Sequence, residues 1–142
     1  TIVTSEEVGK KSVPTFDGIV ASKEWAAKNA DFMAKFTQVL AQSYAGYRAN
    51  NAKWTADSPE VKAMAKLIGG KADEDAEALK LLVFPTVQEQ ASPEWLGGGK
   101  DGGALRALTK SAEFLKSQHQ IDKVLPDYST ALTAKYVQQA AK

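Results

Sequence analysis

The sequence contains no cysteine and a single histidine. The absence of cysteine excludes disulfide bonds, thiolate zinc sites and cysteine nucleophiles. With only His119 present, histidine-based metal or triad chemistry is limited to sites that need one imidazole. Because hydrolase and metalloenzyme interpretations lose their usual residues, we expect no catalytic residues, no metal and no cofactor.

The sequence also lacks an excess of one sign of charge, and it lacks long apolar runs. The chain has 18 Lys and Arg against 17 Asp and Glu, and the two signs alternate along it. Nucleic-acid binding requires a clustered basic surface, so we expect no nucleic-acid partner. No apolar run approaches the ~18 residues of a transmembrane helix.

What is present is the composition of a globular domain. The 142 residues are 44% hydrophobic and 25% charged, which allows a packed core and argues against disorder. At the start of the chain, residues of strand character precede the first lysines, the reverse of a secretory leader. We therefore expect no signal peptide and interpret Thr1 as a processed or truncated start.

Strand signals are confined to residues 1–21. Gly9 and Pro14 divide this stretch into two short extended pieces. The β-branched and aromatic residues that favour strands here are Ile2, Val3, Thr4, Phe16, Ile19 and Val20. One or two short N-terminal strands are therefore predicted.

The remainder of the chain has the periodicity and boundary signals of helices. Apolar residues recur at steps of three and four, separated by Ser-Pro, Gly-Gly and Pro breaks. The predicted helical ranges are 23–48 with a break at 29–31, 58–68, 73–82, short turns near 86–89 and 92–96, 104–119, and a last helix capped by Ser129. The chain is thus predicted to be mostly α-helical.

Two features invite a chemical interpretation that the residues do not support. Gly97 to Gly99 and Gly102 to Gly103 precede a helix, but their spacing matches no phosphate-binding fingerprint, so a flexible linker is the favoured interpretation. His119 lies at the end of a predicted helix without a second ligand one turn away, so capping is favoured over metal binding.

Asp17 lies in an otherwise apolar extended segment. A carboxylate in such a place either pairs or faces a polar cavity when it is buried, because an unpaired buried charge is costly. Strand alternation equally allows an ordinary solvated side chain. The residues alone leave both interpretations open.

Several longer strings, in the same order along nearly the whole chain, resemble the taurine-binding periplasmic proteins of ABC importers. The strings are Pro14-Thr15-Phe16-Asp17, Phe84-Pro85-Thr86, Trp95-Leu96-Gly97-Gly98-Gly99, Glu113-Phe114-Leu115 and the segment from Ile121 to Ser129. The resemblance implies an α/β fold of the type II periplasmic binding protein class, with two lobes and the ligand in the cleft between them.

This family is longer than the present chain, which resembles only its C-terminal part. The resemblance implies that residues 1–12 are the end of the second lobe, residues 13–21 a hinge strand, and residues 22–142 the helical C-terminal part of the first lobe. It also implies a missing N-terminal half as a partner, periplasmic localisation, and delivery of the solute to an ABC permease subunit.

The resemblance further implies a ligand site. Taurine is a zwitterion, so a site needs donors for the sulfonate and an acceptor for the ammonium. Asp17 is the expected ammonium partner, with Thr15 as a polar contact and Phe16 as a wall. After Asp17 the family often has a tryptophan and an arginine where this chain has small residues, which leaves the ligand open among taurine and other small sulfonates or amino acids.

Two alternatives compete with a binding protein. Some biosynthetic enzymes share the two-lobed architecture, but they use clustered histidine and cysteine residues, of which this chain has one and none. A stand-alone helical interaction module is the other alternative, and it would expose a large apolar patch.

Overall fold

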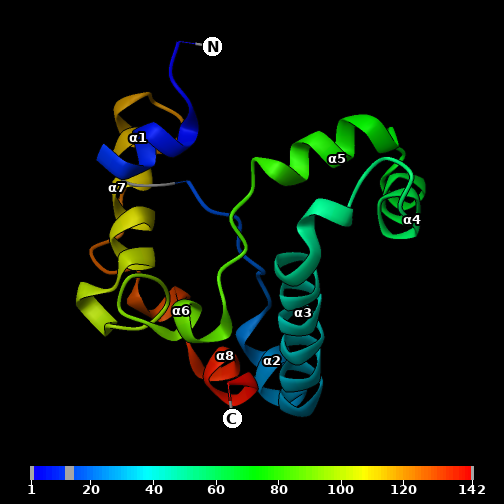
Figure 1. Ribbon diagram of the computed structural model, residues 1–142. Coiled ribbons are helices and arrows are strands. Elements are labelled where there is room, and N and C mark those ends of the chain that lie inside the picture. Colours follow the sequence, from blue (N-terminus) through cyan, green and yellow to red (C-terminus); the bar gives the residue numbers. More distant parts are fainter. Residues whose placement is uncertain (1, 12–14, 142) are drawn as a thin grey trace. The chain divides into compact units, whose positions relative to one another are not determined.

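The computed structural model describes residues 2–11 and 15–141, and the described residues are predominantly helical (Figure 1). The α-helices are α1 (Ser5–Lys11), α2 (Lys23–Lys28), α3 (Ala30–Asn50), α4 (Pro59–Ile68), α5 (Ala72–Lys80), α6 (Val87–Ala91), α7 (Gly103–Ser117) and α8 (Lys135–Ala140). Short 3-10 helices occur at η1 (Asn51–Lys53), η2 (Gly99–Asp101) and η3 (Ser129–Ala131). The prediction of a mostly helical chain is confirmed.

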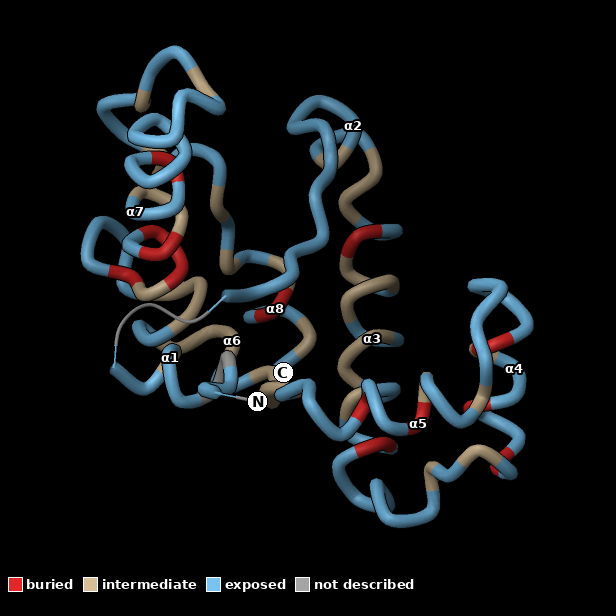
Figure 2. Tube along the Cα trace, turned by 90° about the horizontal axis from the view of Figure 1, so that it is seen from above, coloured by how far each residue is buried: buried red, intermediate tan, exposed pale blue. Residues whose placement is uncertain are grey.

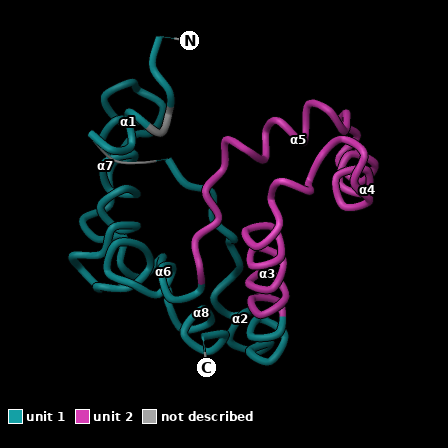
Figure 3. Tube along the Cα trace, in the orientation of Figure 1, with its two compact units in different colours: residues 1–35, 87–142 teal, residues 36–86 magenta. Residues whose placement is uncertain are grey.

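The chain divides into two compact units (Figure 3). Unit 1 consists of residues 1–35 and 87–142, and unit 2 consists of residues 36–86. Helix α3 passes from the first unit into the second. Each unit has packing of its own.

The predicted N-terminal strands are wrong for the residues that the structure describes. Residues 5–11 form α1, and residues 15–22 have no regular secondary structure. Ser12, Val13 and Pro14, which include the start of the predicted hinge strand, lie outside the described residues. A strand needs a neighbouring strand to satisfy its amides and carbonyls, and no strand occurs in residues 2–11 or 15–141.

Helix α1 forms because Thr4 and Glu7 make a capping box. The Glu7 amide donates to Thr4 Oγ1 at 3.2 Å, and the Thr4 amide donates to Glu7 Oε2 at 2.8 Å. These hydrogen bonds from Thr4 lower the pKa of Glu7. Although the branched side chain of Thr4 favours a strand, its position three residues before a glutamate is typical of a helix start.

In unit 2, helix α4 begins and ends where the sequence predicts. Ser58 Oγ accepts from the Val61 amide, and Pro59 occupies the first helical position. Gly69 ends the helix in the left-handed conformation at φ 71°. These local signals do not depend on tertiary structure, which is why they predict both ends of the helix.

The core of unit 2 forms around Tyr47. Buried side chains of α3, α4 and α5 pack together here, and Val61 is completely buried. The Tyr47 ring lies edge-on to Trp54 and Phe84, with ring centroids 5.2 and 4.9 Å away. Its hydroxyl donates to the Leu79 carbonyl at 3.1 Å. One side chain thus links helices that are 32 residues apart in sequence.

In unit 1, α7 is the longest helix after α3, and its buried face carries small residues. Ala104, Leu105, Ala107 and Ala112 are buried. Leu115, in the last turn of the helix, is exposed. The inward face therefore follows the first three turns of the helix and does not extend to its last turn.

Helix α8 packs against α6 within unit 1 and begins later than predicted. Ser129 starts the 3-10 turn η3, and α8 begins at Lys135, whose amide donates to Thr133 Oγ1 at 3.2 Å. Tyr136 Oη donates to the Ala26 carbonyl at 3.2 Å, and Val137 is buried. The C-terminal helix is thereby tied to α2 near the start of the chain.

His119 ends helix α7 in a conformation that favours glycine. Its φ is 56°, and the two amides after the helix donate back to it, His119 to the Lys116 carbonyl and Gln120 to the Leu115 carbonyl. The predicted location at a helix end is confirmed. We expect His119→Gly to raise the free energy of unfolding by about 0.5–1 kcal/mol, because glycine adopts this conformation without a Cβ penalty.

Urea denaturation of the parent and the variant measures this change. The matched control is Gln118→Gly, because Gln118 has an ordinary φ of −90°, so that glycine there only adds flexibility to the unfolded chain. A His119→Gly variant no more stable than the parent would contradict the assignment of strain to this position.

A second prediction concerns the Tyr47 hydroxyl. We expect Tyr47→Phe to lower the free energy of unfolding by about 1 kcal/mol, since the Leu79 carbonyl loses its donor. Tyr44→Phe is the control: the Tyr44 ring also contacts Phe84, but its hydroxyl makes no hydrogen bond within the described residues. Thermal unfolding followed by circular dichroism distinguishes the two, and equal losses would contradict a role for the hydroxyl.

Candidate functional site

The three residues predicted to bind ligand lie in the segment before α2. Thr15, Phe16 and Asp17 are all exposed. The Asp17 carboxylate makes no hydrogen bond or ion pair within residues 2–11 and 15–141. Phe16 folds back toward Gly18, where a Cβ atom would lie 3.8 Å from the ring. The arrangement offers a solvated carboxylate beside an aromatic ring, an acceptor and a wall for a small cation.

The glycine-rich segment is a tightly folded loop, and the prediction of a flexible linker is wrong. Its amides donate to carbonyls of the preceding turn: Gly97 to Ser92 at 2.9 Å, Gly103 to Pro93 at 2.8 Å and Ala104 to Trp95 at 2.9 Å. The amides of Gly103 and Ala104 are those that a phosphate loop would present to its ligand. Since protein carbonyls already accept from them, the segment is not an anion site either.

Glycine is required in this loop by close backbone contacts. A Cβ atom on Gly97 would collide with the Ala91 carbonyl oxygen, one on Gly102 with that of Gly97, and one on Gly103 with that of Glu94. Gly98 has a φ of 79°. The loop therefore holds the start of α7 against the turn at residues 92–95.

Beside this loop unit 1 contains a hollow of about 210 Å³. Its lining comes from the glycine-rich loop, the first turn of α7 and the segment that follows η3: Trp95, Leu96, Gly97, Gly99, Gly102, Leu105, Ser129, Leu132, Thr133 and Ala134. None of these side chains carries a charge, and Thr15, Phe16 and Asp17 do not line it. A hollow without charged side chains offers no ionic partner for the ammonium group of a zwitterion, so it does not replace Asp17 as the candidate ligand site.

One wall of the hollow is fixed by Asp127. Its carboxylate accepts from the Ser129 amide at 2.7 Å and from the Ser129 hydroxyl at 2.8 Å. These two hydrogen bonds, the backbone one first, lower the pKa of Asp127. Sequence reasoning missed this role, although an aspartate that follows a proline and precedes a serine by two residues is typical of such a turn.

The described residues contain no group of three His, Asp or Glu side chains placed to hold a metal ion. Within the same residues, every helix is too short or too polar to cross a membrane.

Comparison with known proteins gives a distant similarity to a periplasmic solute-binding protein. That relative is the taurine-binding periplasmic protein of Escherichia coli (strain K12), which is 27% identical over 137 residues. The match covers 96% of this chain and 41% of the relative's length. No protein-family model and no solved structure matches the chain. By its name the relative is a taurine-binding protein of the periplasm, which agrees in part with the expectation of a periplasmic binding protein.

The close contacts of the glycine-rich loop can be tested by substitution. We expect Gly103→Ala to lower the free energy of unfolding by about 1–3 kcal/mol, because the new methyl group overlaps the Glu94 carbonyl. The control is Gly46→Ala within α3, where a Cβ atom meets nothing within 4 Å and alanine is expected to stabilise the helix by about 0.5–1 kcal/mol. Urea denaturation followed by tryptophan fluorescence reports both, and a tolerated alanine at position 103 would contradict the close contact.

Proposed function

We propose that the chain is the C-terminal part of a solute-binding protein of an ABC importer, and that the whole protein binds taurine or a related small sulfonate. The observation that carries this proposal is the match to a taurine-binding periplasmic protein along 96% of the chain. Its extent supports common ancestry over the entire length, in contrast to a similarity confined to one short motif.

In this proposal Asp17 receives the ammonium group of the solute. A zwitterionic sulfonate needs one acceptor of negative charge and several hydrogen-bond donors. Asp17 supplies the first, and its side chain is exposed. Phe16 covers the short hydrocarbon link, and Thr15 provides a polar contact beside it.

The donors for the sulfonate come from outside this chain in the same proposal. The hollow beside the glycine-rich loop has no charged lining, and the amides of Gly103 and Ala104 are occupied. More than half of the relative's length lies outside the match. We therefore place the sulfonate contacts on a facing lobe formed by that remainder. In the same proposal, residues 13–21 lie at the hinge and residues 22–142 belong to the first lobe.

The biological setting follows from the same proposal. A binding protein that closes over its solute by a hinge motion delivers it to a membrane permease. We propose a periplasmic location and an ABC permease subunit as the protein partner. These assignments follow the named relative, which is periplasmic.

Isothermal titration of the intact gene product with taurine and with ethanesulfonate tests the assignment of Asp17. Ethanesulfonate lacks the ammonium group, so Asp17→Asn is expected to weaken taurine binding by more than tenfold, about 1.4 kcal/mol, and to leave ethanesulfonate binding unchanged. The matched control is Asp122→Asn, since Asp122 is also an exposed aspartate of unit 1.

Two results would contradict the proposal at different levels. Equal affinities of the parent protein for taurine and ethanesulfonate would remove the ammonium role from Asp17. No binding of either sulfonate would remove the ligand class altogether.

A further inference from the structure

The segment before α2, together with α2 and the start of α3, exposes a run of large apolar side chains. We call this set the apolar run; it comprises Phe16, Ile19, Val20, Trp25 and Phe32. Val20 is 93% exposed, Ile19 65%, Phe32 54% and Trp25 45%. Figure 2 shows α2 almost entirely in the colour of exposed residues. Single exposed apolar residues are ordinary, but a series of them within one short stretch of one unit is typical of a contact surface.

Helix α2 is too short to be stable by itself. It has six residues and none of them is buried, whereas isolated helices shorter than about 12–15 residues are marginal in water. Two described contacts hold it: the Trp25 and Phe32 rings meet edge to face at 5.4 Å, and the Ala26 carbonyl accepts from Tyr136. Both aromatic rings keep large exposed faces, so α2 has capacity for further apolar packing.

The total exposed surface points in the same direction. The structure exposes 10648 Å², whereas a compact monomer of its mass exposes roughly 7,100 Å². Two separate compact bodies of half the mass would together expose roughly 8,600 Å², so the excess does not depend on whether the two units touch. This excess is spread over both units, since exposed apolar side chains such as Leu67 and Leu81 of unit 2 contribute to it, and the apolar run is one part of it.

We propose that the apolar run is a permanent contact surface for an apolar face of the remainder of a longer binding protein, in the same gene product. This inference rests on the proposed function. More than half of the relative's length lies outside the match, which is enough polypeptide to cover such a surface. The apolar character of these side chains favours a permanent partner over a transient one, because permanent interfaces are more hydrophobic and resemble a divided core. Trp25 is the expected centre, since tryptophan anchors most strongly.

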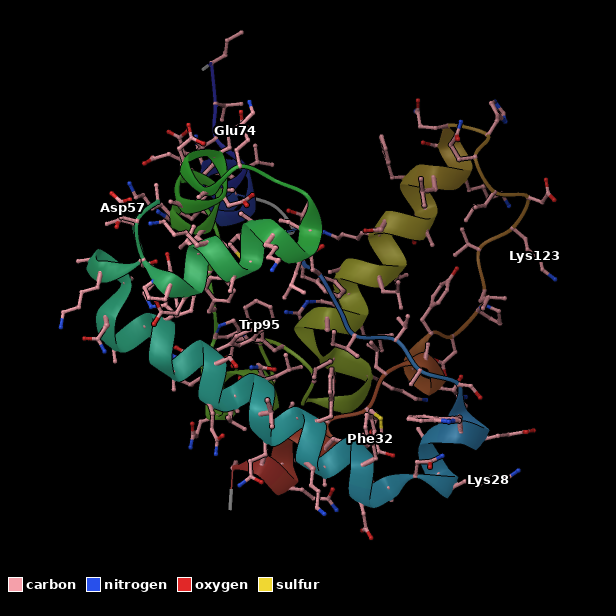
Figure 4. All side chains as sticks on the ribbon, turned by 90° about the vertical axis from the view of Figure 1, so that its right-hand side faces the viewer. Lys28, Phe32, Asp57, Glu74, Trp95 and Lys123 are labelled. Atoms are coloured by element: carbon pink, nitrogen blue, oxygen red, sulfur yellow. The ribbon has the colours of Figure 1, made fainter. Side chains whose placement is uncertain are left out.

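Because the 142-residue chain has no cysteine, one introduced cysteine can report on this surface by thiol labelling. The probe is Val20→Cys, and the control is Lys123→Cys, whose parent side chain extends away from the ribbon of unit 1 (Figure 4). Each variant is made in the intact gene product and in the 142-residue chain alone. Maleimide modification is followed by mass spectrometry of the peptide that carries the new cysteine.

In the intact gene product we expect the thiol of Val20→Cys to react on the order of 100-fold more slowly than that of Lys123→Cys, because labelling requires the cover to open. In the short chain at low concentration the two thiols are expected to react at similar rates. Equal rates in the intact gene product would overturn the proposal. Protection that appears in the short chain only as its concentration rises would also overturn it, by identifying a second copy as the occupant.

This experiment uses no sulfonate, so its outcome is independent of the ligand. Protection of the Val20→Cys thiol in a protein that binds no taurine would retain the contact surface and remove the proposed function. An unprotected thiol in a protein that binds taurine would retain the proposed function and remove the contact surface.

Discussion

The amount of apolar surface that this chain covers is the constraint on which the rest of its structure depends. Burial of apolar area is the largest favourable contribution to folding, and here Val61 is the one large side chain that the described residues bury completely. Tyr47 adds to the core of unit 2 through two ring contacts and a hydrogen bond. Unit 1 combines the buried small residues of α7 and the buried Val137 with close backbone contacts in a glycine-rich loop.

Both ends of helix α4 were predictable from sequence because neighbouring residues set them. Ser58, Pro59 and Gly69 act within one turn of α4, and the structure confirms each of them. The strands near the N-terminus were wrong because β propensity describes a residue in a sheet, and a sheet needs distant partners. Residues 5–11 form helix α1 instead of a strand, and the local pair Thr4 and Glu7 determines where this helix starts.

The glycine-rich loop shows what composition alone does not reveal. Glycine favours flexibility when nothing surrounds it, and it allows the closest packing when backbone lies against it. The same residues at Gly97, Gly102 and Gly103 fit either role, and the carbonyls of Ala91, Gly97 and Glu94 decide for packing. The short distances between those carbonyls and the glycines are a property of the tertiary fold. The candidate site likewise depends on the tertiary fold. The resemblance selects Asp17, but the exposure of this side chain and its hydrogen-bond partners are known only from the structure.

The exposed carboxylate and the exposed apolar run are physically connected. An ammonium group 4 Å from a carboxylate in bulk water gains about 1 kcal/mol, whereas near a protein surface of lower effective dielectric it gains about 4 kcal/mol. Asp17, two residues from Ile19, lies in water in this chain, and a solvated carboxylate discriminates weakly between solutes. A protein face packed over Ile19 and Val20 would exclude water from the neighbourhood of Asp17 and strengthen its attraction for a cation. If Asp17 binds the ammonium group as proposed, a cover over the adjoining apolar side chains would strengthen that interaction, although neither proposal requires the other.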